Sequence, residues 1–270
     1  MNDQALLAIC GEVVDAVTQA LDGVDDWSPP GGRPGQYGID LVADSAALDV
    51  LDRAGLGVLS EESGLRRPDA PLVAVIDPVD GSTNASRRIP WYACSICVLD
   101  ELGPRVSVVA NLSSGVRYSA ARGGGAWREG ARIAPSRCET MGEAVVALSG
   151  YPRRHMGWSQ YRAFGAAALD LCAVAEGSID AYTVVGRSAL GSWDYLGGML
   201  VCTEAGACVQ EIDGLDLVTT GHSDRRSVAA AATPLLLAQV VERAKAARPP
   251  ELLPEGDRTT DPDDAIASAD

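Results

Sequence analysis

Two aspartates three positions apart follow an apolar segment, in the sequence DPVDGS (residues 77–82). The preceding residues 72–76 are typical of a buried strand, so both carboxylates lie at a strand end, where they can converge on one point. Hard oxygen ligands in such a cluster favour Mg²⁺. Gly81 and Ser82 then open the next segment with backbone N–H groups suited to a phosphate oxygen. The segment indicates metal-assisted phosphoryl transfer, although the same residue types also suit an ordinary turn.

Two further acidic segments favour a metal site over an ordinary turn. SEESG (residues 60–64) follows the short apolar strand expected at 57–59, where it could deliver a third carboxylate to the same strand ends. Asp194 stands in the first turn of a helix expected at 193–204. Taken singly, the first segment is typical of a solvated loop and the second of a helix cap. Together they favour a shared metal site.

In this order, SEES, DPVDGSTNA and WDYLGG resemble the motifs of the inositol monophosphatase family. This family belongs to a superfamily of lithium-sensitive, Mg²⁺-dependent sugar phosphatases that includes fructose-1,6-bisphosphatase. The segments RRIPWYACSIC, AVAEGSIDAY and TEAGACV extend the resemblance over roughly residues 35–245. The resemblance implies a layered αβαβα sandwich of the inositol monophosphatase type, with an α+β part followed by an α/β part.

The resemblance also implies a set of metal ligands and two or three Mg²⁺ ions. Glu61 is expected to bind the first ion and orient the attacking water. Asp77 would bridge two ions, and the backbone carbonyl of Val79 would complete the first site. Asp80 and Asp194 would hold the second ion. The implied reaction is in-line attack of a metal-activated water on a phosphate monoester, without a covalent intermediate.

Four further residues receive expected roles in catalysis or binding. Ser82 replaces the family's threonine, whose hydroxyl helps polarise the water, and Asp44 corresponds to an upstream aspartate near the first metal. The backbone N–H groups of Gly81 and Ser82 would bind phosphate. Arg187 either contacts a second anionic group of the substrate or is a solvated loop arginine, the commoner situation for this residue type.

The sequence departs from the family pattern where the substrate is expected to bind. Ala85 stands in place of the usual phenylalanine, and residues 183–192 form a longer segment without the glutamate that contacts an inositol hydroxyl in many members. The expected substrate is a small polyol or sugar phosphate similar to inositol monophosphate. Histidinol phosphate, fructose bisphosphate and a 3′-phosphonucleotide are the alternatives within the superfamily. A catalytically silent interaction protein is the alternative of another class, and the complete set of acids argues against it.

The composition of the chain limits which binding partners and which cellular location we expect for the protein. The 270 residues carry a net charge of −15 without a basic run, which argues against nucleic acid as a partner. No secretory signal or continuous apolar stretch of membrane-spanning length is apparent, so a cytoplasmic protein is expected, and the resemblance implies a homodimer. The odd number of seven cysteines, set in apolar segments, suits buried thiols, and Cys94 and Cys97 should point to opposite faces of a strand. His155 and His222 are interpreted as ordinary surface residues.

Hydrophobic periodicity and turn residues predict the elements that position these groups. We expect an α+β part at residues 1–140 with the metal motifs, an α/β part at 141–247, and a disordered acidic tail at 248–270. The expected helices cover residues 6–21, 45–53, 161–176, 193–204 and 234–247. The expected strands cover residues 57–59, 72–76, 93–99, 106–110, 116–120, 145–148, 179–185, 208–212 and 228–232.

Overall fold

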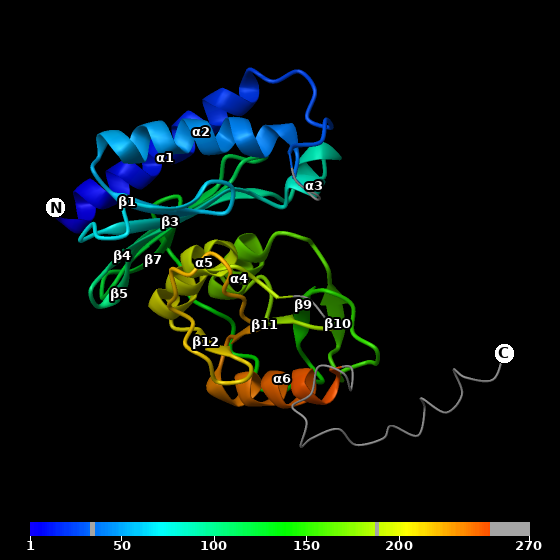
Figure 1. Ribbon diagram of the computed structural model, residues 1–270. Helices are drawn as coiled ribbons and strands as arrows, with labels where there is room; N and C mark the ends of the chain where they lie inside the picture. The colour runs from blue at the N-terminus through cyan, green and yellow to red at the C-terminus, as the bar shows by residue number, and fades with distance from the viewer. Residues whose placement is uncertain (33–35, 187–188, 249–270) are drawn as a thin grey trace.

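Helices and sheets alternate in five layers in the computed structural model, which describes residues 1–32, 36–186 and 189–248 (Figure 1). Helices α1 (Asp3–Asp22) and α2 (Gly38–Arg53) cover the outer face of the first sheet. Helices α4 (Ala167–Ala175) and α5 (Ser192–Ala205) fill the space between the two sheets, and α6 (Pro234–Ala246) covers the second. The expected αβαβα sandwich is therefore confirmed.

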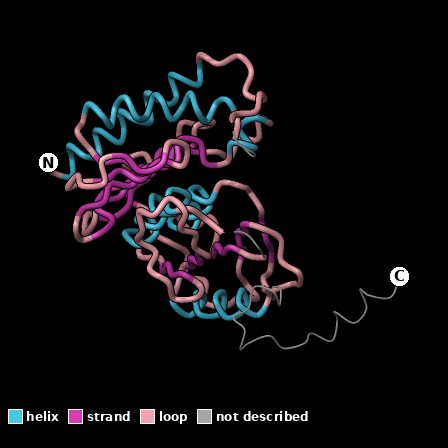
Figure 2. The backbone as a smooth tube through the Cα atoms, viewed as in Figure 1, coloured by secondary structure: helices cyan, strands magenta, loops and turns pink. Residues whose placement is uncertain are grey.

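The first sheet has eight strands in the order β2-β1-β3-β4-β5-β6-β7-β8. In Figure 2 strands of this sheet form a layer beneath the helices of the outer face. Strands β1 and β3 run parallel, and every other neighbouring pair in this sheet is antiparallel. Because β1 and β3 are parallel neighbours, their carboxyl ends lie at the same edge of the sheet. The strands are β1 (Gly57–Ser60), β2 (Gly64–Arg66), β3 (Val73–Asp80), β4 (Ala93–Asp100), β5 (Gly103–Asn111), β6 (Arg117–Ala121), β7 (Gly125–Arg128) and β8 (Ala131–Arg132).

Helix α1 is a core helix with one apolar face. Its buried residues recur every three or four positions and pack on α2 and β5. Within the described chain, α1 is also the one helix whose length and composition would allow it to span a membrane, with a mean hydropathy of 1.3. The buried residues are Leu6, Cys10, Val13, Val14, Val17 and Leu21.

Helix α5 is wedged between the first sheet and α4. A Cβ atom built on Gly197 would lie 2.6 Å from the Ser95 hydroxyl oxygen on β4. A Cβ atom built on Gly198 would lie 2.7 Å from the Leu171 Cβ and 2.8 Å from the Ala168 carbonyl oxygen on α4. The two glycines of WDYLGG therefore permit a close approach of α5 to β4 on one side and to α4 on the other.

The second sheet has five strands in the order β10-β9-β11-β13-β12. Strand β9 runs parallel to β10 and β11, whereas β13 is antiparallel to β11 and β12. Helix α6 begins at Pro234 after the cap residue Thr233, whose side chain accepts a hydrogen bond from the Leu236 N–H. The strands are β9 (Val145–Ser149), β10 (Gln160–Arg162), β11 (Ala181–Val184), β12 (Cys208–Glu211) and β13 (Val228–Ala231).

Three expectations about the elements were wrong. The predicted helix at 161–176 begins only at Ala167, because Gln160–Arg162 pairs with β9 as an exposed edge strand. The helix predicted at 45–53 begins seven residues earlier, at Gly38. The short strands β2, β7 and β8 were not predicted. The expected tail lies outside the described residues from 249 onward.

The cysteine predictions are confirmed. All seven cysteines are free thiols, five of them buried. Cys94 and Cys97 pack into the clusters on opposite faces of the first sheet. Burial raises the pKa of the Cys94 thiol to about 12, so this thiol stays protonated and inert near neutral pH.

Candidate active site

The parallel pairing of β1 with β3 brings Glu61 to Asp77. Ser60 is the register partner of Ile76, so the next residue of each strand lies at the same sheet edge. The Glu61 N–H continues the pairing by donating to the Ile76 carbonyl oxygen at 3.3 Å. The two carboxylates that the sequence places sixteen positions apart are thereby neighbours.

A bulge shapes the end of β3. Asp77 pairs with Ser95 and Asp80 with Ala93, so three steps along β3 match two along β4. The Asp77 carboxylate accepts a hydrogen bond from the Val79 N–H at 2.9 Å and so closes a tight turn. Neither Pro78 nor Val79 has a register partner on β4, so the irregular pairing is compatible with the ligand role that the sequence predicts for the Val79 carbonyl.

The middle layer supplies the remaining acid. Asp194 is the third residue of α5, and its Oδ2 accepts a hydrogen bond from the Gly191 N–H at 2.7 Å. Carboxylate oxygens of Glu61, Asp77 and Asp194 lie within 4.8 Å of one another. Asp80 accepts from the Ala168 N–H at 2.7 Å, in the first turn of α4. The N-terminal ends of two helices thus face the acidic cluster and offset part of its charge.

The electrostatics of this cluster fit a divalent cation. Burial, followed by the charges of Glu61, Asp80 and Asp194, raises the pKa of Asp77 well above its ordinary value. Burial likewise raises the pKa of Asp80 to about 8 and that of Asp194 to about 7. The charge of Asp80 adds to the rise at Asp194, while the Gly191 N–H and the Arg225 cation oppose it. Converging carboxylates of this kind ionise fully only beside a cation, and their hard oxygens suit Mg²⁺.

Gly81 and Ser82 turn the chain directly after the acids. Gly81 has φ +86°, and a Cβ atom there would lie 3.0 Å from the Gly165 carbonyl oxygen. Helix α3 (Ser82–Ser86) follows, and its first hydrogen bond joins the Ala85 N–H to the Gly81 carbonyl. The N–H groups of Gly81 and Ser82 precede that bond, as the predicted phosphate contact requires. The Asn84 amide holds this turn by donating to the Phe164 carbonyl at 2.6 Å.

Helix α2 carries two buried aspartates, Asp40 and Asp44, on the side of the Glu61 turn. Asp44 accepts a hydrogen bond from the Ser60 hydroxyl at 2.5 Å and lies behind the Glu61 loop. Asp40, which sequence analysis missed, lies one turn earlier on α2, and its Oδ1 atom is buried without a hydrogen bond within the described chain. Burial raises the pKa of Asp40 to about 7. Hydrogen bonds from the Tyr37 N–H and the Ser82 hydroxyl oppose this rise, whereas the charges of Glu62 and Glu61 add to it.

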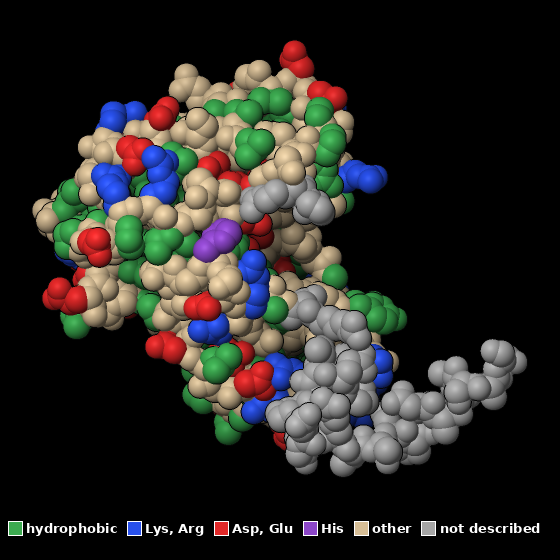
Figure 3. All heavy atoms as spheres, viewed as in Figure 1, with side chains coloured by type: hydrophobic (Ala, Val, Ile, Leu, Met, Phe, Trp, Pro, Cys, Tyr) green, Lys and Arg blue, Asp and Glu red, His purple; other side chains and the backbone are tan. Residues whose placement is uncertain are grey.

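A pocket of about 280 Å³ opens beside the acids, with Asp80 and Asp194 in its lining. Among the described lining residues none is cationic. Besides the acids, the polar side chain in this lining is Ser149, which accepts a hydrogen bond from the Tyr182 hydroxyl at 2.8 Å. The visible face of the molecule is hollowed between the sheets, with acidic side chains in the hollow (Figure 3). The rest of the lining is Leu148, Gly150, Ala163, Gly165, Ala167 and Leu190.

The structure bears differently on Arg187, Ala85 and His222. Arg187 lies outside the described residues, so its expected role stays a prediction. Ala85 is buried in the core beside Tyr92 and lines a separate cavity of about 470 Å³ with Trp27, away from the pocket beside the acids. The interpretation of His222 as an ordinary surface residue was wrong: its ring is half-buried, and Nε2 lies 3.0 Å from the Glu61 carbonyl oxygen. Glu61 and His222 are 161 positions apart, and no sequence motif predicts a contact between them.

The five-layer fold, with carboxylates converging between its sheets, can be compared with known proteins. The model of the inositol monophosphatase family matches residues 39–247. The chain is 34% identical over 229 residues to a fructose-1,6-bisphosphatase/inositol-1-monophosphatase of Archaeoglobus fulgidus, covering 80% of this chain and 88% of the relative. It is 30% identical over 227 residues to Nus factor SuhB of Escherichia coli strain K12, covering 77% and 80%.

Solved structures agree with this assignment. The inositol monophosphatase of Anabaena (Nostoc) sp. PCC 7120 superposes with a TM-score of 0.75 at 25% sequence identity, covering 92% of this chain and 98% of that one. The protein belongs to the inositol monophosphatase family.

Proposed function

We propose that this protein is a Mg²⁺-dependent phosphatase that hydrolyses a small polyol or sugar phosphate monoester similar to inositol monophosphate. One observation carries the proposal: the carboxylate oxygens of Glu61, Asp77 and Asp194 lie within 4.8 Å of one another. Asp194 also lines the adjoining pocket, so a phosphate placed at the acids would leave its alcohol portion in that pocket.

The residues divide the work of hydrolysis. Glu61, Asp77, the Val79 carbonyl, Asp80 and Asp194 would hold the metal ions. The chemistry that Mg²⁺ supplies when bound is neutralisation of charge on the phosphoryl oxygens and a lower pKa for a coordinated water.

Proton transfer and phosphate binding fall to residues beside those acids. The N–H groups of Gly81 and Ser82 bind a phosphate oxygen and fix its orientation. The Ser82 hydroxyl lies close enough to the Asp40 carboxyl to lower its pKa, and we assign to this pair the orientation of the attacking water and the acceptance of its proton.

The pocket supports a neutral, hydroxylated leaving group. Its described lining consists of small residues with one hydroxyl side chain at Ser149, besides the acids. A volume of about 280 Å³ suits a single small ring better than a nucleotide. Fructose bisphosphate needs a cation for its second phosphate group, and within the described lining no such cation is present. Histidinol phosphate carries a cationic amino group instead, so the ester panel below separates it from a polyol phosphate.

Phosphate release from a panel of esters tests the proposal. Inositol, sugar, histidinol and nucleotide phosphates are offered with Mg²⁺, with EDTA and with added Li⁺. We expect Mg²⁺-dependent release from a polyol or sugar monoester, and a loss of about 100-fold or more in Asp80→Asn. Asp69→Asn, at an exposed aspartate, is the matched control and should keep wild-type activity. Full activity of Asp80→Asn, or release that EDTA leaves unchanged, contradicts the assignment.

The second candidate function is that of an interaction protein. A specific observation favours it, because relatives at 30% identity are named Nus factor SuhB. An inactive Asp80→Asn protein that still complements loss of the gene in its host would support this function over catalysis. The cytoplasmic location, the homodimer and the lack of a nucleic-acid partner stay predictions.

A further inference from the structure

The loop between β12 and β13 reaches back to the metal site through His222. The Nε2 atom of His222 lies 3.0 Å from the Glu61 carbonyl oxygen. A carbonyl oxygen only accepts hydrogen bonds, so Nε2 carries the proton and donates it. The imidazole ring also lies against the indole of Trp193, with ring centroids 4.9 Å apart and planes inclined by 33°. Trp193 directly precedes Asp194, so one side chain touches the segments of two predicted metal ligands.

Neighbouring groups fix His222 in this place. Arg225 stacks on the same indole, with its guanidinium carbon 5.1 Å from the ring centroid, and donates to the His222 carbonyl at 2.9 Å. The Thr219 hydroxyl donates to the Asp224 carboxylate across the turn, and the Gly221 N–H donates to the Thr219 hydroxyl oxygen at 3.1 Å. The turn that carries His222 is therefore held by its own side chains.

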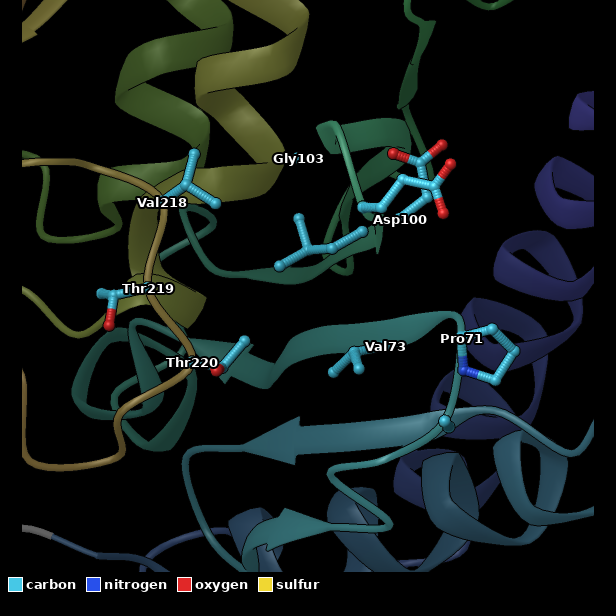
Figure 4. Close-up of a pocket in the computed structure, with 10 residues that line it drawn as sticks. Pro71, Val73, Asp100, Gly103, Val218, Thr219 and Thr220 are labelled. Atoms are coloured by element: carbon cyan, nitrogen blue, oxygen red, sulfur yellow. The ribbon is translucent and has the colours of Figure 1, made fainter.

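The residues just before His222 in this loop lie near the start of β3. Val218, Thr219 and Thr220 line a separate cavity of about 440 Å³ with Pro71 and Val73 (Figure 4). The Tyr195 hydroxyl on α5 donates to the Leu217 carbonyl oxygen at 2.6 Å. The loop thus runs along the neighbouring strands β1 and β3, from the start of β3 to the end of β1. There His222 contacts the backbone of Glu61.

We infer that His222 is a positioning residue, which holds the Glu61 segment against the Asp194 segment and so raises the affinity of the site for Mg²⁺. Glu61 lies in the turn between β1 and β2, where its backbone can shift more easily than a strand residue such as Asp77. The His222 N–H, held by its contact with Trp193 of α5, restrains the turn that carries Glu61. Glu61 is then already placed to bind the ion when the ion arrives. The metal role of these acids rests on the proposed function.

Two substitutions separate the hydrogen bond from the stacking. His222→Phe keeps an aromatic ring against Trp193 but removes the N–H donor, whereas His222→Gln keeps a donor of similar reach without the ring. His155→Phe is the matched control, because His155 also lies against a tryptophan, Trp158, with centroids 4.7 Å apart. His155 belongs to the region around α6 and lies outside the acid cluster.

Three readouts are measured on the full chain: amide hydrogen exchange of residues 58–66 without metal, calorimetric Mg²⁺ binding, and initial rates across Mg²⁺ concentrations. We expect His222→Phe to speed exchange after Ser60 and to weaken Mg²⁺ binding by about 10-fold or more, the usual range for groups behind metal ligands. In His222→Phe, the half-saturating Mg²⁺ concentration should rise by a larger factor than the factor by which kcat falls. His222→Gln should recover most of the affinity, and His155→Phe should match the wild type.

Unchanged exchange and unchanged Mg²⁺ affinity in His222→Phe would overturn the inference. So would equal losses in His222→Phe and His155→Phe, which would indicate a general packing defect. If His222→Phe fails to fold, the comparison of His222→Gln with His222→Ala decides by the same readouts. The exchange and calorimetric results do not depend on turnover, so a protein that hydrolyses no ester can still confirm or refute the role of His222.

Discussion

At the scale of single residues, the site shows both what motifs reveal and what they miss. Glu61, Asp77, Asp80 and Asp194 can be found from the sequence because each lies in a short motif at the end of an expected strand or the start of a helix. Choosing between Asp40 and Asp44 is harder. They are four positions apart on one helix and therefore share a face, so which one meets Ser82 depends on where α2 begins.

Substituting each aspartate separates their roles. Asp40→Asn should lower kcat by about 100-fold at saturating Mg²⁺, since it removes a proton acceptor beside Ser82. Asp44→Asn should chiefly lower stability, by about 1–3 kcal/mol, because its partner Ser60 is fully buried. Steady-state kinetics and urea unfolding of both variants check this. A larger kcat loss in Asp44→Asn than in Asp40→Asn would restore the sequence-based assignment.

At the scale of elements, α5 is the helix on which the site depends. It carries Asp194 in its first turn and packs on both the first sheet and α4, with almost no apolar periodicity because most of its sides are buried. Its position relative to β3 sets the distance between Asp77 and Asp194. Small residues where α5 meets its neighbours therefore matter for the metal site as well as for stability.

Two glycine substitutions test this close packing. Gly198→Ala should destabilise the protein by about 1–2 kcal/mol, because the new methyl group overlaps the Ala168 carbonyl of α4. Gly11→Ala, in α1, has no atom within 4 Å of its added Cβ and should stabilise by about 0.5–1 kcal/mol through helix propensity. The free energies of unfolding in urea give both values, and a stabilising Gly198→Ala would contradict the packing argument.

Most elements can be predicted from the sequence, and those that cannot share a physical cause. Long apolar repeats such as that of α1 and buried strands such as β3 carry strong periodic signals. Strand β10 is exposed at every position and exists through pairing with β9, so its own residues give no signal. The contact of His222 with Glu61 is likewise tertiary, because it depends on how a distant loop folds across the sheet.

At the scale of the whole molecule, the acids join separate layers. Glu61, Asp77 and Asp80 come from the first sheet, whereas Asp194 comes from the middle layer. Trp91 of the first sheet region adds a further link, since its indole N–H donates to the buried Asp170 of α4 at 2.8 Å. The interface between layers therefore contains titratable carboxyl groups, and its free energy should depend on pH.

Stability without metal should fall as the pH rises. Burial raises the pKa of Asp80 to about 8 and that of Asp40, Asp170 and Asp194 to about 7. The folded chain thus binds more protons than the unfolded chain between about pH 4 and 8, and folding loses free energy across that window. We expect the melting temperature in EDTA to drop by at least about 5 °C from pH 5 to pH 8.

Saturating Mg²⁺ should abolish most of this drop, because the ion favours the ionised ligands. Differential scanning calorimetry at both pH values, with and without Mg²⁺, measures the effect. A melting temperature in EDTA that stays constant or rises with pH would show that the carboxyls ionise without cost in the folded chain.

The distribution of the acids over two layers has a consequence for the lifetime of the protein. An ion that binds only the assembled layers stabilises them by about 2.7 kcal/mol when its free concentration is 100 times its dissociation constant. Proteases cleave chains in their opened state, and the population of that state falls with the same free energy. The supply of free cation would then set how long each molecule survives, as well as how fast it works.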